Sequence, residues 1–506
     1  MNNFNKTINP STELGGMQFA GDASAGSAGA RYLRRPGVRS TNARSSQRIA
    51  FAGLFIFTLL LYIRPNEMFP EVLGTFPISK IVALIAVFAY VASKLGSGEG
   101  LTIKPLELKL LAVIALLGVA FAPLAAAPMD SVDMLLDMFI KVMVIFVLMI
   151  NVITTPRRLR LMVSLVVVCG TIFALLAIKS YLAGDFTVIE KKDVGVVGLR
   201  ITGAVGGFFG NPNDLATSLN MLLPLAIALA VTSRGLKRIS YFACGAILAG
   251  GVIVTFSRGG FLGLLTMGGV LLWKAGRQNR VTTTIAFAVL FGVFVLAMPG
   301  GYAGRITSMF NIGDDPTGSS QARRDLLDRA INVAVHHPLI GVGMGNFHIY
   351  SIHEQVAHNS YLEIAAELGI AGLAAYLLLI FTPLRSLRRI QRERAIQAAG
   401  FARNDPEASR SREIHYLSIA LQGVLFAYIV CSFFGSIQYQ WFLYYPVAYA
   451  IALRRIHESE RAASNVPHET AFVAARNAIQ PRGVVWKEKR EVAAITIAAR
   501  SGSLNA

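Results

Sequence analysis

The chain passes from a loop into a strongly apolar helix over residues 358–384, HNSYLEIAAELGIAGLAAYLLLIFTPL. Ser360 and Glu363 have the spacing of a capping box, so we predict that the helix starts at or near Ser360. His358 then lies just before the helix, beside the positive end of its dipole. Because that dipole disfavours the imidazolium, we expect a neutral imidazole that can accept a proton. The alternative is a polar residue that caps the helix without any role in chemistry.

The composition of the whole chain is that of a membrane protein. Its 506 residues are 54% hydrophobic and only 15% charged, whereas about 25% is usual in globular proteins. Several apolar runs reach about 20 residues, the length that an α-helix needs to cross a bilayer. A β-barrel is excluded, because its strands are shorter and alternate in polarity. We therefore predict an all-α, polytopic membrane protein.

About twelve spans can be placed on the apolar runs. They are expected at about 49–63, 76–93, 106–126, 132–153, 159–181, 213–232, 238–256, 259–274, 281–298, 361–384, 415–434 and 441–453. The membrane domain is thus predicted at 48–455, between a disordered basic tail at 1–47 and a second basic tail at 456–506. No apolar region with a cleavage site appears in the first tail, so we do not expect a signal peptide there.

The basic residues gather in alternate loops, as the positive-inside rule predicts for cytoplasmic connections. These loops carry Lys94 and Lys104; Arg157, Arg158 and Arg160; Arg234, Lys237 and Arg238; Lys274, Arg277 and Arg280; Arg385, Arg388, Arg389, Arg392 and Arg394; and Arg454 and Arg455. We therefore expect both termini in the cytoplasm. The net charge of +19 is explained by these loops, and we expect no binding of nucleic acid.

The longest connection, 299–358, lies on the opposite side in this topology and has internal order. Residues 320–334 have the pattern of an amphipathic surface helix, and Pro338 follows its end. Residues 341–347 form a glycine-rich turn. Since a connection of this length inside a membrane protein is more often functional than not, we expect it to contribute to a site.

Two arginines share this outer face with His358. Arg200 precedes the segment Gly-Asn-Pro-Asn-Asp at 210–214, and Arg258 lies in the Ser-Arg-Gly-Gly turn at 257–260. Together they could bind a phosphate or pyrophosphate through bidentate hydrogen bonds, and the glycines beside Arg258 would let the backbone approach such a ligand. The alternatives are a solvated loop charge for Arg200 and a snorkelling side chain for Arg258.

Other polar and thiol groups have simpler explanations. Glu363 fits a helix cap and Glu367 an internal polar contact, although Glu367 could instead orient a catalytic or substrate group. Asp137 and Lys141 are four residues apart on one helix, and their pairing explains both charges. The three cysteines lie in apolar runs without the spacing of metal ligands, so we expect core thiols and no metal site.

Several motifs together resemble the O-antigen ligase and polymerase superfamily. They are His358-Asn359 followed by Gly369 and Gly372, Arg200 with the segment at 210–214, the turn at 257–260, and Pro338-Leu339-Ile340-Gly341-Val342-Gly343. The resemblance covers about 190–380, the motif-bearing core, and extends loosely to the number of spans. We expect Gly369 and Gly372 to let a neighbouring helix approach and fix the histidine.

The resemblance implies an inverting glycosyltransferase of the bacterial inner membrane that needs neither metal nor cofactor. Such enzymes take a glycan from undecaprenyl pyrophosphate on the periplasmic face. By resemblance, His358 is the catalytic base, and Arg200 and Arg258 bind the pyrophosphate. A further family arginine corresponds to Arg323 or Arg324. Asn359 and Glu367 are further candidates for substrate contact.

The acceptor stays open at this point. A ligase passes the glycan to a sugar of the lipid A core, whereas a polymerase passes it to another carrier-linked glycan, and we take the ligase as the leading hypothesis. A transporter or flippase for lipid-linked glycans would also need about a dozen spans. It should show internal repeats and a site near the midplane of the membrane, and the sequence has neither feature.

Overall fold

The computed structural model describes residues 41–74, 76–98, 100–191, 195–201, 209–275, 281, 319–400 and 406–464. Most of both predicted tails therefore lies outside the described residues. So do nearly all of the span expected at 281–298 and the first part of the long connection.

Within these ranges, nine helices are long and apolar enough to cross a membrane. These candidate spans are Ser45–Met68, Ile78–Ser97, Leu106–Leu124, Pro128–Val152, Pro156–Ala183, Pro212–Thr232, Leu236–Val254, Ser360–Ile396 and Glu407–Phe434. Two more predicted spans form helices that carry charged residues, α11 (Arg258–Ala275) and α18 (Trp441–Ser464). The predicted class, an all-α polytopic membrane protein, is confirmed.

The remaining helices follow the chain in order. They are α1 (Thr41–Ile63), α2 (Pro65–Met68), α3 (Pro70–Leu73), α4 (Ile78–Ser97), α5 (Leu106–Phe121), α6 (Pro128–Asp133), α7 (Ile140–Val152), α8 (Pro156–Ala183), α9 (Pro212–Thr232), α10 (Leu236–Val254), α14 (Ser319–His336), α15 (Phe347–Tyr350), α16 (Ser360–Gly400) and α17 (Pro406–Cys431). A π-helical segment, Met134–Phe139, joins α6 to α7, and short 3-10 turns occur at Ala122–Leu124, Ile352–Glu354 and Ser432–Phe434.

Small residues let the long helices pack closely. A Cβ atom added at Gly53 of α1 would lie 2.7 Å from the Cβ of Ala86 on α4. One added at Gly251 of α10 would lie 2.8 Å from the Cβ of Ala174 on α8. Helix α9 is the most enclosed candidate span, with contacts to α8, α10, α11 and α17. This packing fixes where the N-terminus of α9 lies, and hence one wall of the candidate site.

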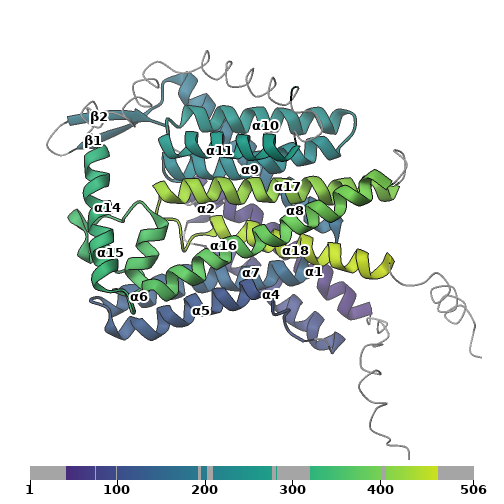
Figure 1. Ribbon diagram of the computed structural model, residues 1–506, viewed down its shortest axis with the longest axis horizontal. Helices are drawn as coiled ribbons and strands as arrows, with labels where there is room; N and C mark the ends of the chain where they lie inside the picture. The colour runs from purple at the N-terminus through teal and green to yellow at the C-terminus, as the bar shows by residue number, and fades with distance from the viewer. Residues whose placement is uncertain are drawn as a thin grey trace, which may run out of the picture.

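A two-stranded antiparallel hairpin lies in the connection between the spans predicted at 159–181 and 213–232, and the sequence did not lead us to expect it. Its strands are β1 (Thr187–Lys191) and β2 (Gly195–Arg200), which pair Thr187 with Arg200. In Figure 1 this hairpin, α14 and α15 lie together at one end of the bundle, and the outer ends of α1 and α18 lie at the other. The two ends of the described chain therefore share a side, and the loop elements occupy the opposite one.

Candidate active site

The helix after His358 starts where we predicted, at Ser360, but its cap differs from the prediction. The side-chain oxygen of Asn359 accepts hydrogen bonds from the backbone N–H groups of Tyr361 (3.0 Å) and Leu362 (3.1 Å). Asn359 is thus the N-cap, because its oxygen satisfies two N–H groups that have no partner within the helix. Our prediction of a capping box between Ser360 and Glu363 is therefore wrong.

Ser360 is instead a link between α16 and the connection that follows α17. Its hydroxyl donates to the carbonyl oxygen of Gly435 (2.7 Å) and accepts from the N–H of Ile437 (2.9 Å). The side chain is fully buried. The start of α16 is therefore held from both sides, by its own cap and by a second segment of chain.

His358 lies directly before this anchored cap and has a left-handed backbone, with a φ of 50°. Its side chain is half-buried, whereas Asn359 and Ser360 are 1% and 0% exposed. Left-handed backbone is uncommon for residues other than glycine, asparagine and aspartate, and it persists where the surroundings impose it. Of the three residues, the imidazole is thus the group that a substrate can reach.

Two buried carboxylates on α16 hold the neighbouring loops. Glu363 is 5% exposed and accepts from the N–H of Ala357 (2.9 Å), from the amide of Gln438 (2.9 Å) and from the hydroxyl of Ser436. Since Ala357 is the residue before His358, Glu363 fixes the approach to the histidine. It does so from inside the helix and not as the partner of Ser360.

Glu367 lies one turn further along and is 2% exposed. Its carboxylate accepts from the phenol of Tyr439 (2.8 Å) and from the N–H of Phe347 (3.3 Å). Burial raises the pKa of Tyr439 above its usual value, so the phenol stays protonated and donates a hydrogen bond to Glu367. In this arrangement Glu367 joins α16 to α15 and to the connection after α17.

Helix α16 is broken at Gly369, where φ is 64° and ψ is −166°. The glycine-rich turn fits into the break. The N–H groups of Val342 and Gly343 donate to the carbonyls of Ala366 (2.9 Å) and Glu367 (3.0 Å), and the N–H of Ile370 donates to the carbonyl of Pro338 (2.8 Å). A Cβ atom at Gly369 would lie 2.6 Å from that carbonyl oxygen. Gly369 therefore admits a loop and not, as we expected, a neighbouring helix.

The predicted surface helix is confirmed as α14, Ser319–His336. It packs on the first part of α16 through a small cluster that includes Ala330, Val333, Phe347 and Ala366. Arg323 is half-buried and Arg324 is exposed on this helix. The long connection is thus folded against the segment that carries His358.

The turn at 257–260 lies where α11 starts beside α9. The hydroxyl of Ser257 donates to the side-chain oxygen of Asn213 (2.8 Å) and accepts from the N–H of Gly260 (3.1 Å). Asn213 follows Asn211, whose side chain caps α9. The two helix N-termini are therefore adjacent, and Arg258 is the first residue of α11.

The glycines after Arg258 serve packing. A Cβ at Gly259 would lie 2.8 Å from the Cβ of Phe434, and one at Gly260 would lie 2.5 Å from the Cβ of Ala216. These contacts explain both glycines by packing, and our expectation that they open the backbone to a ligand stays a prediction. Their contacts have a second consequence, because Phe434 precedes Gly435, the partner of Ser360. Arg258 and His358 thus flank one junction, linked through 434–435.

The other arginine, Arg200, ends strand β2, which belongs to the same end of the molecule (Figure 1). Its side chain lies outside the described residues.

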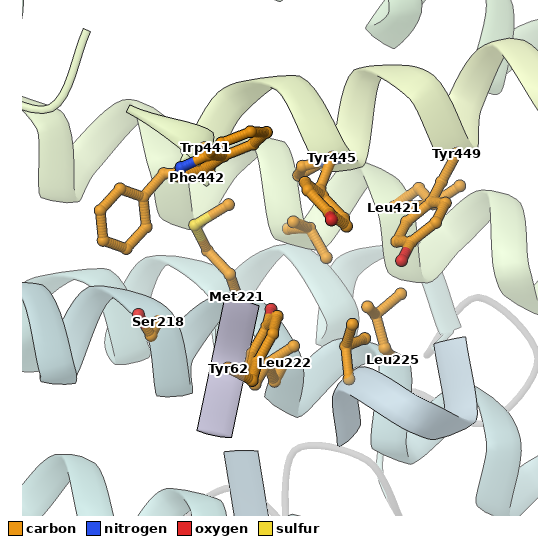
Figure 2. Close-up of a pocket in the computed structure, with 13 residues that line it drawn as sticks. Tyr62, Ser218, Met221, Leu222, Leu225, Leu421, Trp441, Phe442, Tyr445 and Tyr449 are labelled. Atoms are coloured by element: carbon orange, nitrogen blue, oxygen red, sulfur yellow. The ribbon is translucent and has the colours of Figure 1, made fainter. Parts of the chain in front are cut away.

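A separate cavity of about 30 Å³ lies between α9, α17 and α18, lined by Tyr445, Tyr449, Trp441 and Met221 among others (Figure 2). Because each water needs about 10–15 Å³ by this measure, the cavity has room for about two water molecules and not for a sugar. None of the predicted site residues lines it.

Residues 243–377 match the family model described as O-antigen ligase. This segment is similar to an O-antigen ligase domain. The predicted resemblance is thereby confirmed, and no curated protein matches the chain. The matched segment includes Arg258, α14, the glycine-rich turn, His358 and the break in α16. Arg200 lies outside it. The matched segment therefore covers part of the junction described above, whereas the start of α9 and the connection after α17 lie outside it.

Sequence reasoning missed the connection after α17 as part of this site. Ser436, Gln438 and Tyr439 supply partners to both buried carboxylates. One feature of the sequence could have indicated this connection, the mostly polar run Ser436-Ile437-Gln438-Tyr439-Gln440 between two apolar helices. It faces the pair Glu363 and Glu367, which need hydrogen-bond donors once they are buried.

Proposed function

We propose that this protein is a glycan ligase that acts on the periplasmic face of the bacterial inner membrane. A hydroxyl of a lipid A-core sugar attacks the anomeric carbon of a glycan carried on undecaprenyl pyrophosphate. The bond from that carbon to the pyrophosphate oxygen breaks with inversion, and His358 takes the proton of the hydroxyl. Lipid pyrophosphate is an activated leaving group, so the step needs no nucleotide.

One observation carries this proposal. Within the segment that matches the O-antigen ligase family model, the half-buried imidazole of His358 follows a loop fixed by Glu363 and precedes a helix start fixed by Asn359 and Ser360. A general base must be held within hydrogen-bond reach of the proton that it removes, and such anchoring supplies the required precision.

The surroundings of Arg258 support binding of the pyrophosphate. Arg258 begins α11, and the capped N-terminus of α9 lies next to it. Helix N-termini are positive and favour anions, so the two dipoles and the guanidinium act in the same sense. Growth of negative charge on the leaving oxygen would be stabilised here, and removing one such group typically costs about 3 kcal/mol in the transition state.

We assign positioning roles to two of the residues named as further candidates. Asn359 and Glu367 are buried and engaged with backbone and phenol groups, so they act through the placement of His358 and the glycine-rich turn. Arg323 or Arg324 on α14 remains the proposed further contact to the sugar or pyrophosphate, and Arg200 the second arginine of the pyrophosphate site.

The base assignment is tested with His358→Asn. Asparagine tolerates the left-handed backbone that residue 358 adopts, whereas alanine does not. The asparagine variant should therefore keep its thermal stability and its binding of donor but lose transfer. Substantial turnover by this variant would remove His358 as the base.

The acceptor is tested with purified protein and a labelled undecaprenyl-pyrophosphate glycan. One reaction contains lipid A core and the other contains a second carrier-linked glycan. Label on lipid A core supports the ligase. A longer carrier-linked glycan would establish the polymerase instead, and passage of intact donor across a vesicle membrane without transfer would establish a transporter.

A further inference from the structure

A basic pocket lies between the last residues of α11 and the second half of α16. Its volume is about 210 Å³, and it is lined by Trp273, Lys274, Arg388, Gln391 and Arg392. Arg388 and Arg392 are one turn apart on α16 and lie close enough to repel the Lys274 ammonium group. Three positive charges thus converge on one hollow.

The Lys274 side chain is held in place by amide groups. Its ammonium donates to the side-chain oxygen of Gln391 (3.2 Å) and to that of Gln422, and Gln422 also donates to Gln391 (3.0 Å). Amide oxygens orient the ammonium but do not neutralise it. Since an ammonium has three N–H donors, one is left beyond these two bonds.

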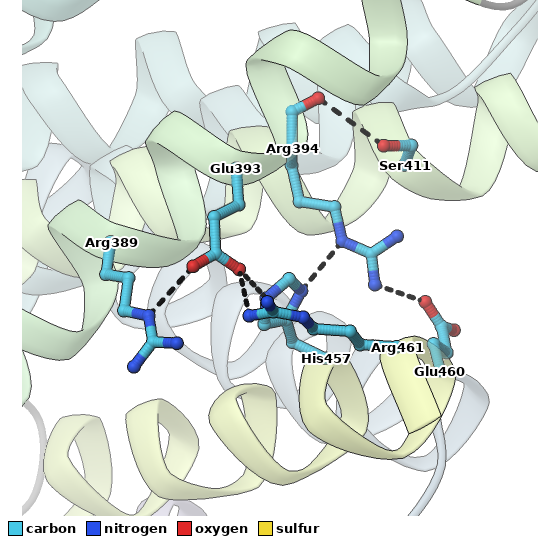
Figure 3. Close-up of polar contacts among 7 residues, drawn as sticks. All are labelled: Arg389, Glu393, Arg394, Ser411, His457, Glu460 and Arg461. Atoms are coloured by element: carbon cyan, nitrogen blue, oxygen red, sulfur yellow. Dashed lines mark hydrogen bonds and ion pairs between the residues drawn. The ribbon is translucent and has the colours of Figure 1, made fainter. Parts of the chain in front are cut away.

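The adjacent face of α16 is different, as Figure 3 shows. There Arg389 pairs with Glu393 (2.8 Å) and Arg394 pairs with Glu460 (2.6 Å). Among the described residues, no carboxylate forms an ion pair with Lys274, Arg388 or Arg392. Carboxylates of α16 and α18 therefore neutralise one set of the cations of α16, whereas Arg388 and Arg392 face a pocket.

We propose that Lys274, Arg388 and Arg392 bind the phosphate of an anionic phospholipid headgroup. A phosphodiester supplies the charge that this pocket lacks, and arginine and lysine are the side chains that recognise it. The pocket lies where apolar helices end in basic residues, and the indole of Trp273 is 71% exposed beside it. Exposed tryptophan is characteristic of the membrane–water interface, and basic pockets between helices there bind lipid headgroups.

The test compares two triple variants of the full chain. The pocket variant carries Lys274→Gln, Arg388→Gln and Arg392→Gln. The control carries Lys237→Gln, Arg234→Gln and Arg238→Gln, which remove the same charge from exposed positions around the start of α10. Binding of phosphatidylglycerol and phosphatidylcholine is measured by native mass spectrometry, with inorganic phosphate as a competitor.

We expect the pocket variant to bind phosphatidylglycerol about 100-fold more weakly, because each basic residue near the surface contributes about 1 kcal/mol. The control should bind as the unmodified chain does, phosphatidylcholine should bind poorly, and millimolar inorganic phosphate should not compete. Equal losses in both variants would overturn the proposal, as would equal binding of both lipids. Displacement by inorganic phosphate would make this a site for free anions and overturn the lipid assignment. Thermal unfolding of the single variants Arg388→Gln and Arg392→Gln, which alter only exposed side chains, separates loss of binding from loss of fold.

Discussion

Replacing Gly369 with alanine should detach the glycine-rich turn from α16. The backbone of Gly369, with φ 64° and ψ −166°, is accessible essentially to glycine alone, and forcing another residue into it costs about 1–3 kcal/mol. The added Cβ would also lie 2.6, 2.7 and 2.8 Å from backbone atoms of Pro338 and Leu339, which cannot rotate away. If the helix straightens to relieve this clash, the three hydrogen bonds across the break are lost, at about 1 kcal/mol each. The cost is then about 3 kcal/mol, which replaces the strain and does not add to it.

The assay is hydrogen exchange of the backbone amides, followed by mass spectrometry of the detergent-solubilised protein. Loss of about 3 kcal/mol of hydrogen bonding corresponds to at least a hundredfold loss of protection at Val342, Gly343 and Ile370. Gly269→Ala is the matched control, because a Cβ there has no atom within 4 Å, and it should leave the same amides protected. Unchanged exchange in Gly369→Ala would refute the account of the break.

Three further outcomes follow from contacts of the described residues. Arg454→Ala should destabilise the fold by about 3–5 kcal/mol, because it leaves the fully buried carboxylate of Glu107 without its bidentate partner (2.8 and 3.0 Å); adding Glu107→Gln should restore most of the melting temperature. Glu363→Gln presents an amide where donors converge, including the N–H of Ala357; kcat should fall at least tenfold with the KM for donor unchanged, and an equal rise in KM would contradict a positioning role. Arg258→Lys keeps the charge but loses the guanidinium fork; steady-state kinetics should show a KM for donor raised about tenfold, and an unchanged value would exclude contact with pyrophosphate.

The span positions were predictable because hydrophobic length is a property of the sequence alone. The same holds for α14, whose apolar stripe and following proline mark both its face and its end. The pairing of Asp137 with Lys141, predicted from their spacing, is confirmed at 2.8 Å. Each of these features depends on residues within a few turns of one another.

The features that build the candidate site depend on contacts between residues far apart in the chain. Such contacts could not be predicted from local sequence patterns. Asn359 and Ser360 are both residue types that often cap helices. Asn359 is the cap here because the Ser360 hydroxyl is already bonded to the carbonyl of Gly435 and the N–H of Ile437. Gly369 reads as a helix-packing glycine until the turn at 338–343 is seen in contact with it. The pattern of residues was visible in each case, but the partner was not.

The cap at Asn359 and the break at Gly369 enclose a short rigid rod, Ser360 to Leu368, gripped at both ends. The number of residues in this segment sets both the distance and the rotation between the cap and the break. One inserted residue would advance the helix by about 1.5 Å and turn it by about 100°, so His358 would point away from its present direction while the turn in the break stayed where it is. A conservative substitution inside this segment is therefore less harmful than a change in the number of its residues. Insertions there should be among the most damaging alterations to the chain.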